Sequence, residues 1–396
     1  MNNFRSQELT GKNINKFIIL LLLSILGIMA SNAYDNPSFV LFSYVLEIIL
    51  IGYTFLYTFK RNSHIILNKY VALSTAILLT NFLLSPYNPR MPMLLKFFGY
   101  LCSFGYGYSL ASENIKPLVS NKWLYSLVIL PVLCVFLFDD TDGKNVFFEN
   151  SNVFVFLGIS LSLLFMFMKG ENKKYQYIAW SILLLYMIVG TSLGIVVAVA
   201  LAFIIINYRR LNLLYLILAV VILLNIIFFI DLPVFIRFRD VIAVWQSLSW
   251  YDIMNIQDIN FNDLGNSVDR LGSRSDTTSS IWRITQWLKI LSMYISKPFS
   301  IPFGLGADFA ISKTGLPPHN DYLMILTEYG LIFFLMFFKI VYKSYKFIAR
   351  REVLYLVVVV FCYYITENLI NSFPQNIILY FVIGYCLFGH IKTHTK

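Results

Sequence analysis

The chain has 396 residues, of which 58% are hydrophobic and 13% are charged, and its formal net charge is +10 at pH 7. A soluble domain carries about twice that share of charged residues, so the composition excludes a soluble globular protein and predicts an integral membrane protein. The basic residues flank apolar segments. We therefore interpret the positive charge as an orientation signal and expect no nucleic-acid partner.

Long apolar segments predict an all-α, polytopic membrane protein with about twelve transmembrane helices, since one such helix needs ~20 mostly apolar residues. The apolar run at 175–207 is too long for one helix, and Gly190-Thr191-Ser192 provides a turn at which we divide it. The predicted spans are 17–31, 38–59, 68–84, 92–112, 122–138, 152–168, 175–190, 192–207, 212–230, 320–342, 353–370 and 375–390.

Basic residues are distributed unequally over the loops between these spans. With the N-terminus in the cytoplasm, 20 basic residues lie inside, whereas the short outer loops hold only Arg90 and Lys144. This asymmetry follows the positive-inside rule and predicts that both termini are cytoplasmic. The predicted organisation is nine spans in 1–230, one large outer loop at 231–318, and three spans with a cytoplasmic tail in 319–396.

Cofactor and metal motifs are absent from the sequence. The four cysteines all fall within predicted spans, and there is no Cys/His cluster with zinc-ligand spacing, no phosphate-binding loop and no dinucleotide fingerprint. We therefore predict neither a metal site nor a cofactor. Glu47 and Lys96 lie inside predicted spans, where a charge is costly unless it is paired or close to a cavity. Snorkelling toward the membrane surface is an alternative explanation for Lys96.

The outer loop 231–318 contains stretches of different character. Residues 231–250 mix apolar and basic side chains, and they either continue the ninth helix or lie on the membrane surface. Residues 251–280 are rich in Asp, Asn and Ser and predict a loop. Apolar residues at helical spacing predict an amphipathic helix over 281–291. The prolines and glycines of 298–318 predict a turning, non-helical connection.

An ordered set of short motifs runs from this loop into the last three predicted spans. It comprises Arg283, Trp287, Pro298, Gly304-Leu305-Gly306, His319-Asn320-Asp321-Tyr322-Leu323 and Glu328-Tyr329-Gly330-Leu331, with Phe148-Glu149-Asn150-Ser151-Asn152 before them and Glu367-Asn368 after them. In this order the motifs resemble the bacterial O-antigen polymerase / O-antigen ligase family, over roughly 145–390. The family's plan of twelve spans and one large outer loop agrees with the predicted topology.

The resemblance implies a multi-pass glycosyltransferase of the bacterial inner membrane, which acts in the biosynthesis of lipopolysaccharide or a related surface polysaccharide. Its donor and acceptor would be oligosaccharide repeat units on polyprenyl diphosphate, and a chain-length regulator and a flippase are candidate partners. One alternative is an O-antigen ligase that transfers the polymer to the lipid A core. A less favoured alternative is a secondary transporter or flippase, which would need paired ionisable residues and broken helices near the midplane.

One place departs from the family pattern. Family members often carry an arginine near the turn before the eighth span, where this chain reads Thr191-Ser192-Leu193-Gly194. The resemblance implies that the ligase branch uses this arginine to bind its lipid diphosphate, so its absence favours the polymerase branch. The candidates to replace it as substrate-binding residues are Arg237, Arg239, Arg270 and Arg274, and each alone is also explained as a solvated surface arginine.

Transfer from a lipid diphosphate requires a cation for the departing diphosphate, a base for the attacking hydroxyl and an apolar site for the polyprenyl tail. Arg283 fits the first role, because a guanidinium stays charged and binds phosphate oxygens in a planar fork. His319 fits the second, because an imidazole accepts protons near neutral pH. Asp321 or Glu328 could orient His319, and the sequence does not choose between them.

Both candidate catalytic residues also have structural explanations. Arg283 could be a solvated or headgroup-facing arginine on an amphipathic helix. His319 could simply begin a helix after two prolines, with Asn320 as its cap. However, His319 is the only histidine that the predicted topology places outside. Asn320 and Tyr322, which flank the predicted start of the tenth span, complete the predicted substrate-binding set.

Overall fold

The computed structural model describes residues 2–34, 37–66, 69–83, 85–87, 91–112, 121–137, 151–169, 172–190, 192–207, 229, 233–247, 279–315, 317–348 and 350–394. Within these residues every regular element is a helix and no strand occurs, so the all-α prediction is confirmed for the described part of the chain. The predicted loop at 251–278 lies outside the described residues.

Helices occur at most of the predicted span positions, while the number of twelve membrane crossings stays a prediction. Eleven of the twelve spans coincide with a helix, in whole or in part, while 212–230 lies outside the described residues apart from Phe229. In chain order the elements are α1 (Asn2–Tyr34), α2 (Pro37–Ile66), α3 (Lys69–Leu83), α4 (Met91–Ser112), α5 (Asn121–Leu137), α7 (Ser151–Lys169), α8 (Lys173–Gly190), α9 (Leu193–Asn207), α11 (Pro233–Ser247), α14 (Ser279–Ile295), the short 3-10 helix η3 (Pro298–Ser300), α15 (Phe309–Thr314), α16 (Asp321–Phe347), α17 (Arg351–Tyr363) and α18 (Phe373–His394).

Several of these helices have the length and composition of membrane spans. Among the described residues, four helical stretches are long and apolar enough to cross a bilayer: Asn13–Ala33, Pro37–Arg61, Asn152–Lys169 and Asp321–Phe347. Three further apolar helices are shorter, namely Lys122–Cys134, Gly194–Asn207 and Phe373–Leu387. This content fits an all-α membrane protein.

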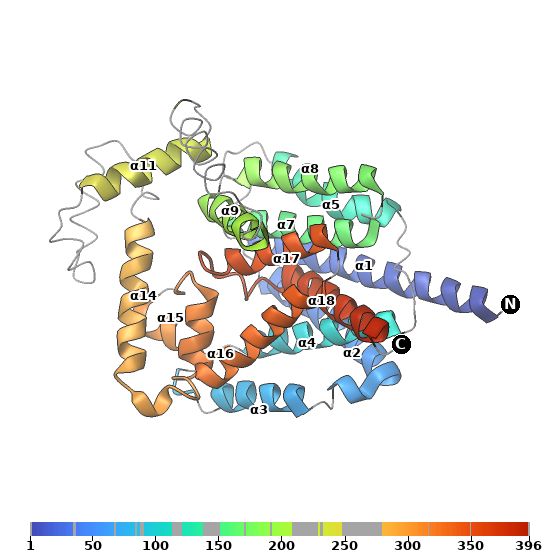
Figure 1. Ribbon diagram of the computed structural model, residues 1–396, viewed down its shortest axis with the longest axis horizontal. Coiled ribbons are helices and arrows are strands. Elements are labelled where there is room, and N and C mark those ends of the chain that lie inside the picture. The colour runs from blue at the N-terminus through green and yellow to red at the C-terminus, as the bar shows by residue number, and fades with distance from the viewer. Residues whose placement is uncertain are drawn as a thin grey trace.

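The two ends of the helix bundle differ (Figure 1). Most long helices run along the horizontal direction of the view, and both chain ends lie on the right. On the left, α14, α15 and the first part of α16 cross the bundle, and we call this side the α14 end. The residues that close the predicted outer loop therefore cover the end of the bundle opposite to the two termini.

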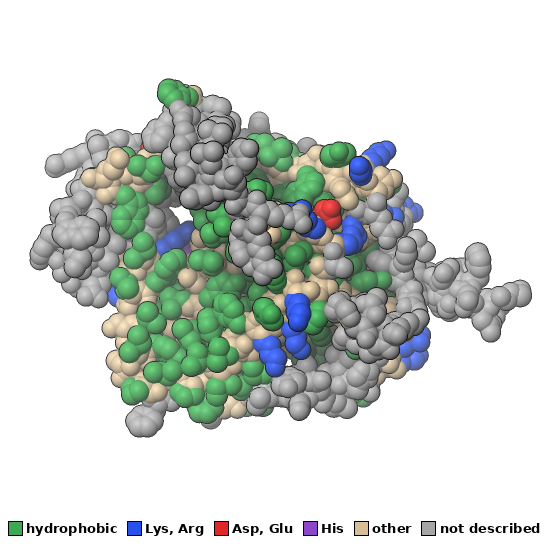
Figure 2. Space-filling model, in the orientation of Figure 1, with side chains coloured by type: hydrophobic (Ala, Val, Ile, Leu, Met, Phe, Trp, Pro, Cys, Tyr) green, Lys and Arg blue, Asp and Glu red, His purple; other side chains and the backbone are tan. Residues whose placement is uncertain are grey.

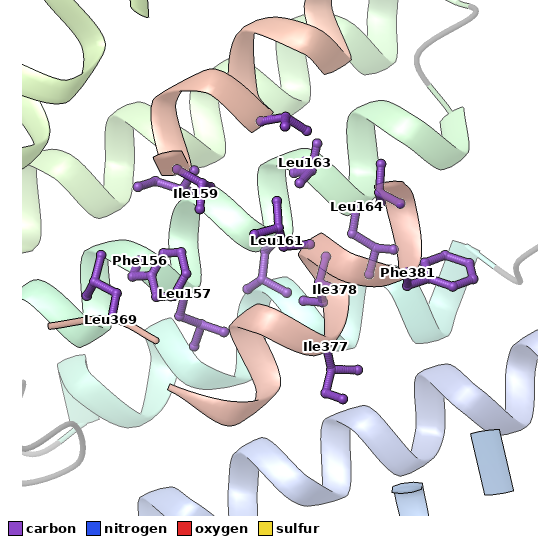
Figure 3. Close-up of a cluster of buried hydrophobic side chains, with 14 of the residues drawn as sticks. Phe156, Leu157, Ile159, Leu161, Leu163, Leu164, Leu369, Ile377, Ile378 and Phe381 are labelled. Carbon is purple, nitrogen blue, oxygen red and sulfur yellow. The ribbon is translucent and has the colours of Figure 1, made fainter. Parts of the chain in front are cut away.

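Helix α7 lies at the centre of the bundle. Every residue from Phe154 to Phe167 is buried, and the helix is apolar on all sides, which is typical of a helix enclosed by others. Figure 3 shows Leu161 of α7 and Ile378 of α18 directed into one cluster of buried side chains.

Two glycines bring α4 against α18. A Cβ atom built on Gly107 would lie 2.1 Å from the carbonyl oxygen of Phe381, and one built on Gly384 would lie 2.1 Å from the carbonyl oxygen of Phe104. Small residues at a helix crossing let the two backbones approach closely. Because of this contact, polar side chains of α4 reach the connection between α17 and α18.

The predicted span 320–342 is not one straight helix. Gly330 adopts φ 83° and ψ 171° inside α16, and the chain changes direction there (Figure 1). Glycine is the usual residue at such an angle because it has no Cβ. The segment before Gly330 lies beside α14 and α15, and the segment after it runs along the bundle.

The segment 301–306 makes hydrogen bonds with backbone groups of α16 that have no helical partner at the break. The Leu305 amide donates to the Thr327 carbonyl at 2.8 Å, and the Leu331 amide donates to the Ile301 carbonyl at 2.9 Å. Broken helices within a membrane protein persist only where such groups find partners. The predicted non-helical connection at 298–318 thus stabilises the break in α16 through backbone hydrogen bonds.

Other predicted boundaries also need correction. The eleventh span was predicted as 353–370, but α17 ends at Tyr363 and residues 364–372 form an irregular connection, because side chains bind their backbone groups in place of a helical ladder. The connection at 298–318 contains two short helices, η3 and α15, that the sequence did not indicate.

Replacement of Gly330 by alanine tests the break in α16. A Cβ there would lie 2.4 Å from the Pro302 carbonyl oxygen and 2.4 Å from the Gly304 nitrogen, at a positive φ. Backbone strain alone costs about 1–3 kcal/mol, and the clash adds to it, so we expect a clear fall in the melting temperature of the purified protein.

Two other glycines provide matched controls. Gly315 also has a positive φ, but a Cβ there meets nothing within 4 Å, so Gly315→Ala should show only the strain. Gly52 is helical with open space around it, so Gly52→Ala should be silent. If Gly330→Ala proved as stable as Gly315→Ala, the close contact between Gly330 and the backbone of 302–304 would contribute nothing to stability.

Candidate functional site

Three residues from separate segments meet at the α14 end. The Nη1 atom of Arg283 lies 3.1 Å from Oε1 of Glu367, and Nδ1 of His319 lies 3.3 Å from Oε2 of the same carboxylate. The Glu367 side chain is 3% exposed, whereas those of Arg283 and His319 are 22% and 26% exposed. A buried carboxylate therefore bridges a cation and an imidazole that both remain accessible.

Helix α14 carries Arg283 to this position. It is amphipathic, as predicted, and buries Thr285, Ile290 and Tyr294 against the bundle. Arg283 Nη1 also donates to the carbonyl oxygen of Thr366 at 2.8 Å. Its Nε atom is buried and makes no hydrogen bond to the residues that the structure describes. The guanidinium thus anchors α14 to the bundle, and within the described part of the chain one of its donors is unused.

The backbone at His319 is held in an unusual conformation. Its φ is 48°, in the left-handed region that few residues other than glycine adopt. Before it, Trp287 Nε1 donates to the Pro318 carbonyl oxygen at 2.5 Å. After it, Asn320 Oδ1 accepts the Leu323 amide at 3.0 Å and caps α16. Asn320 therefore begins the helix, and a strained His319 is not explained by helix capping.

The imidazole of His319 is enclosed on two sides. Glu367 lies at its Nδ1 atom, and the ring of Trp282 packs edge-to-face with a centroid separation of 5.4 Å. A carboxylate at Nδ1 favours the tautomer that carries its proton there, which leaves Nε2 as a proton acceptor. The arrangement can therefore present one ring nitrogen to a substrate as a base.

Asp321 does not orient His319, contrary to one of the two predicted alternatives. The side chain is fully buried, and its Oδ2 atom accepts the amides of Leu369 and Ile370 at 2.8 and 2.9 Å. These amides belong to the irregular connection 364–372, where no helical partner exists for them. Asp321 instead fixes the segment that carries Glu367.

Glu328 does not orient His319 either. Its carboxylate accepts the amides of Asp308 and Ala310, each at 3.2 Å, and thereby binds the start of α15. The orienting carboxylate is Glu367, which the sequence marked only as part of a motif. Its signal was a polar step, Thr366-Glu367-Asn368, inside an otherwise apolar predicted span.

The start of α9, at the turn before the eighth predicted span, lies next to the cluster. A Cβ built on Gly194 would lie 3.2 Å from Oε1 of Glu367 and 2.7 Å from Oγ1 of Thr366. The hydroxyl of Ser192 lies 2.9 Å from that of Tyr363. Glu367 therefore faces the first turn of α9, whose partial positive charge stabilises a carboxylate.

The remaining predicted site residues take different places. The Tyr322 hydroxyl donates to the Phe361 carbonyl oxygen at 2.7 Å and joins α16 to α17, so this group has a structural role. Substrate contacts by Asn320 and Tyr322 stay predictions. Arg239 lies on α11, which packs against α9. Arg237 is on the same helix, but its side chain lies outside the described part of the structure, as do Arg270 and Arg274.

The surface view agrees with this arrangement. Figure 2 shows basic and histidine side chains in a recess between α14 and α9, whereas most other basic surface in the view lies toward the end that carries both termini. No protein-family model, curated protein or solved structure matches this chain.

Variants at Asp321 test its role in fixing the Glu367 segment. Asp321→Ala leaves two buried amides without an acceptor, and each such loss costs about 1–3 kcal/mol. Asp321→Asn retains one carbonyl oxygen and should be less destabilised. We expect the order wild type, Asn, Ala in the melting temperature of the purified protein. An Ala variant as stable as the Asn variant would show that these hydrogen bonds contribute little.

Proposed function

We propose that this protein is a glycosyltransferase of the bacterial inner membrane, and that it polymerises oligosaccharide repeat units carried on polyprenyl diphosphate. The supporting observation is the cluster of Arg283, Glu367 and His319. A cation and an oriented base, which the chemistry of transfer requires, come together from distant parts of the sequence. The same residues carry the resemblance to O-antigen polymerases and ligases.

In the proposed reaction His319 is the general base. Its Nε2 atom takes the proton from a sugar hydroxyl of the acceptor unit while that oxygen attacks the anomeric carbon of the donor. Glu367 holds the Nδ1 proton and stabilises the imidazolium that forms. Trp282 keeps the ring in place beside the incoming sugar.

Arg283 acts on the leaving group. The bond between the anomeric carbon and the diphosphate oxygen breaks, and the electron pair stays on the diphosphate, where a guanidinium stabilises it. Glu367 already balances one positive charge, so a diphosphate needs further cations. Arg239 on α11, together with Arg237 and Arg274, is the proposed source.

The proposed orientation places both termini in the cytoplasm and the α14 end outside. Basic residues at the terminal end support it: Arg350 donates to the carbonyl oxygens of Met166 and Phe167, and Arg351 to the side chain of Asn207. Outside the membrane no nucleotide sugar is at hand, and the lipid diphosphate is itself a competent leaving group. A chain-length regulator and a flippase remain the proposed partners.

A secondary transporter is the alternative that one observation favours. Such proteins use broken helices and intramembrane charges, and this chain has a break at Gly330 and a buried Glu47 near Lys96. However, the backbone groups at the break are bound by 301–306, so they are not available to coordinate an ion. We therefore rank this alternative below both the polymerase and the ligase.

A gene deletion in the host tests the proposed reaction. Loss of a polymerase leaves lipopolysaccharide with a core and a single repeat unit on a gel. A core without any repeat would indicate the ligase instead. An unchanged ladder together with an unchanged capsule would contradict both forms of the proposal.

Point variants then test the assigned roles. Asparagine tolerates the left-handed backbone, so His319→Asn should fold, yet it cannot act as the base. We expect His319→Asn and His319→Ala to lower polymer formation by about 10²–10⁴-fold. Arg283→Lys keeps the charge without the planar fork and should be impaired less than Arg283→Ala.

The matched control is Lys289→Met, an exposed residue of the same helix. It should leave polymer yield unchanged at equal protein levels. A fully active His319→Asn variant would remove the base from this mechanism, and a fully active Arg283→Ala variant would reduce that arginine to an anchor of α14.

Cysteine labelling tests the orientation. Ser296 and Asn172 are exposed at opposite ends of the bundle, and the native cysteines are free thiols that can be replaced. In intact spheroplasts an impermeant maleimide should label Ser296→Cys and spare Asn172→Cys. Labelling of Asn172→Cys with protection of Ser296→Cys would show that the orientation is the opposite one.

A further inference from the structure

The connection 364–372 between α17 and α18 is irregular and partly buried, with Ile365 exposed and the stretch around Leu369 enclosed by the bundle. Leu369 and Ile370 are 1% and 2% exposed. Backbone groups in such a place must find partners within the protein. Glu367 belongs to this connection, so its position depends on the groups that bind the backbone around it.

Helix α4 provides two of these groups from neighbouring turns. Lys96 Nζ donates to the Asn371 carbonyl oxygen at 2.9 Å, and the Tyr100 hydroxyl donates to the Ile370 carbonyl oxygen at 2.5 Å. The two side chains are four residues apart, so they lie on one face of the helix. α4 therefore binds two successive carbonyls of the connection, while Asp321 binds its amides from the other side.

The ammonium of Lys96 has a hydrogen-bond partner within the protein. It lies at a backbone carbonyl of the connection, in a partly buried position, and it interacts electrostatically with Glu47 of α2, which is 6% exposed. A lone charge among membrane helices is costly, and this lysine has both an acceptor and a nearby counter-charge. An apolar side chain could fill the space at this position, but it could not donate a hydrogen bond to the connection. We therefore look for a role that depends on the ammonium.

We infer that Lys96 is a positioning residue for the transfer reaction, an inference that rests on the proposed function. Its hydrogen bond holds Asn371, four residues beyond Glu367, and so keeps the carboxylate between Arg283 and His319. In this role Lys96 acts through Glu367 and not on the substrate itself. Loss of its ammonium would loosen the connection and weaken the hold of Glu367 on Nδ1 of His319.

The first experiment measures the connection directly and does not depend on activity. Hydrogen–deuterium exchange is followed in a peptide that covers 364–372, in the full-length purified protein. In Lys96→Met, a variant of similar length without a donor, exchange of the protected amides should be about tenfold faster or more. Lys96→Arg should restore protection, and Lys289→Met should match wild type. Unchanged exchange in Lys96→Met would overturn the anchoring role.

The second experiment measures kinetics with lipid-linked repeat units from the host strain. Per folded enzyme, Lys96→Met should lower kcat about tenfold or more with little change in KM, and its pH profile should move toward that of Glu367→Gln. Lys96→Arg should recover most of the rate. Faster exchange in Lys96→Met together with a wild-type kcat and pH profile would overturn positioning and leave a structural lysine.

Two further outcomes bear on the role of Lys96. If Lys96→Met fails to fold, Tyr100→Phe removes a single hydrogen bond from the same connection and should show the same pattern in milder form. An unaltered Tyr100→Phe protein would then count against the inference. If His319→Ala retained full activity, the proposed function would fail, while the exchange measurement would still decide whether α4 anchors the connection.

Discussion

Two hydrogen bonds to one buried carboxylate hold the α14 end of this protein together. Asp321 accepts the amides of Leu369 and Ile370, and this joins the start of α16 to the connection between α17 and α18. His319 lies two residues before Asp321, and Glu367 lies two residues before Leu369. The pairing that satisfies buried amides therefore also brings the imidazole to the carboxylate, at 3.3 Å.

The break at Gly330 makes this pairing possible. The nine residues of α16 before the break would extend about 14 Å further along the bundle if the helix were straight. Instead they turn across the α14 end, where Asp321 meets the connection. This change of direction depends on the segment 301–306. Its amides and carbonyls bind the backbone groups of α16 that have no helical partner at the break. Segments that look like a loop and a span in the sequence are therefore one structural unit.

The sequence predicted the helices well, because a long apolar segment in a bilayer can satisfy its backbone hydrogen bonds in few ways other than as a helix. It also pointed to Arg283 and His319, through motif order rather than through geometry. It offered Asp321 or Glu328 as the partner of His319 and missed Glu367, because the three carboxylates differ only in which distant backbone amides or side chains they meet. The early end of α17 was missed for the same reason, since partners from α4 and α16 decide it.

The charge balance of the cluster has a consequence for the lipids around it. Phospholipid headgroups are abundant at the membrane surface, and each offers a phosphate to any free guanidinium. Because Glu367 already pairs with Arg283, a single phosphate gains little by displacing it. A ligand with two linked phosphates, reached by further arginines, gains more. If the proposed reaction holds, the internal ion pair would favour a lipid diphosphate over the single phosphates of the bulk bilayer.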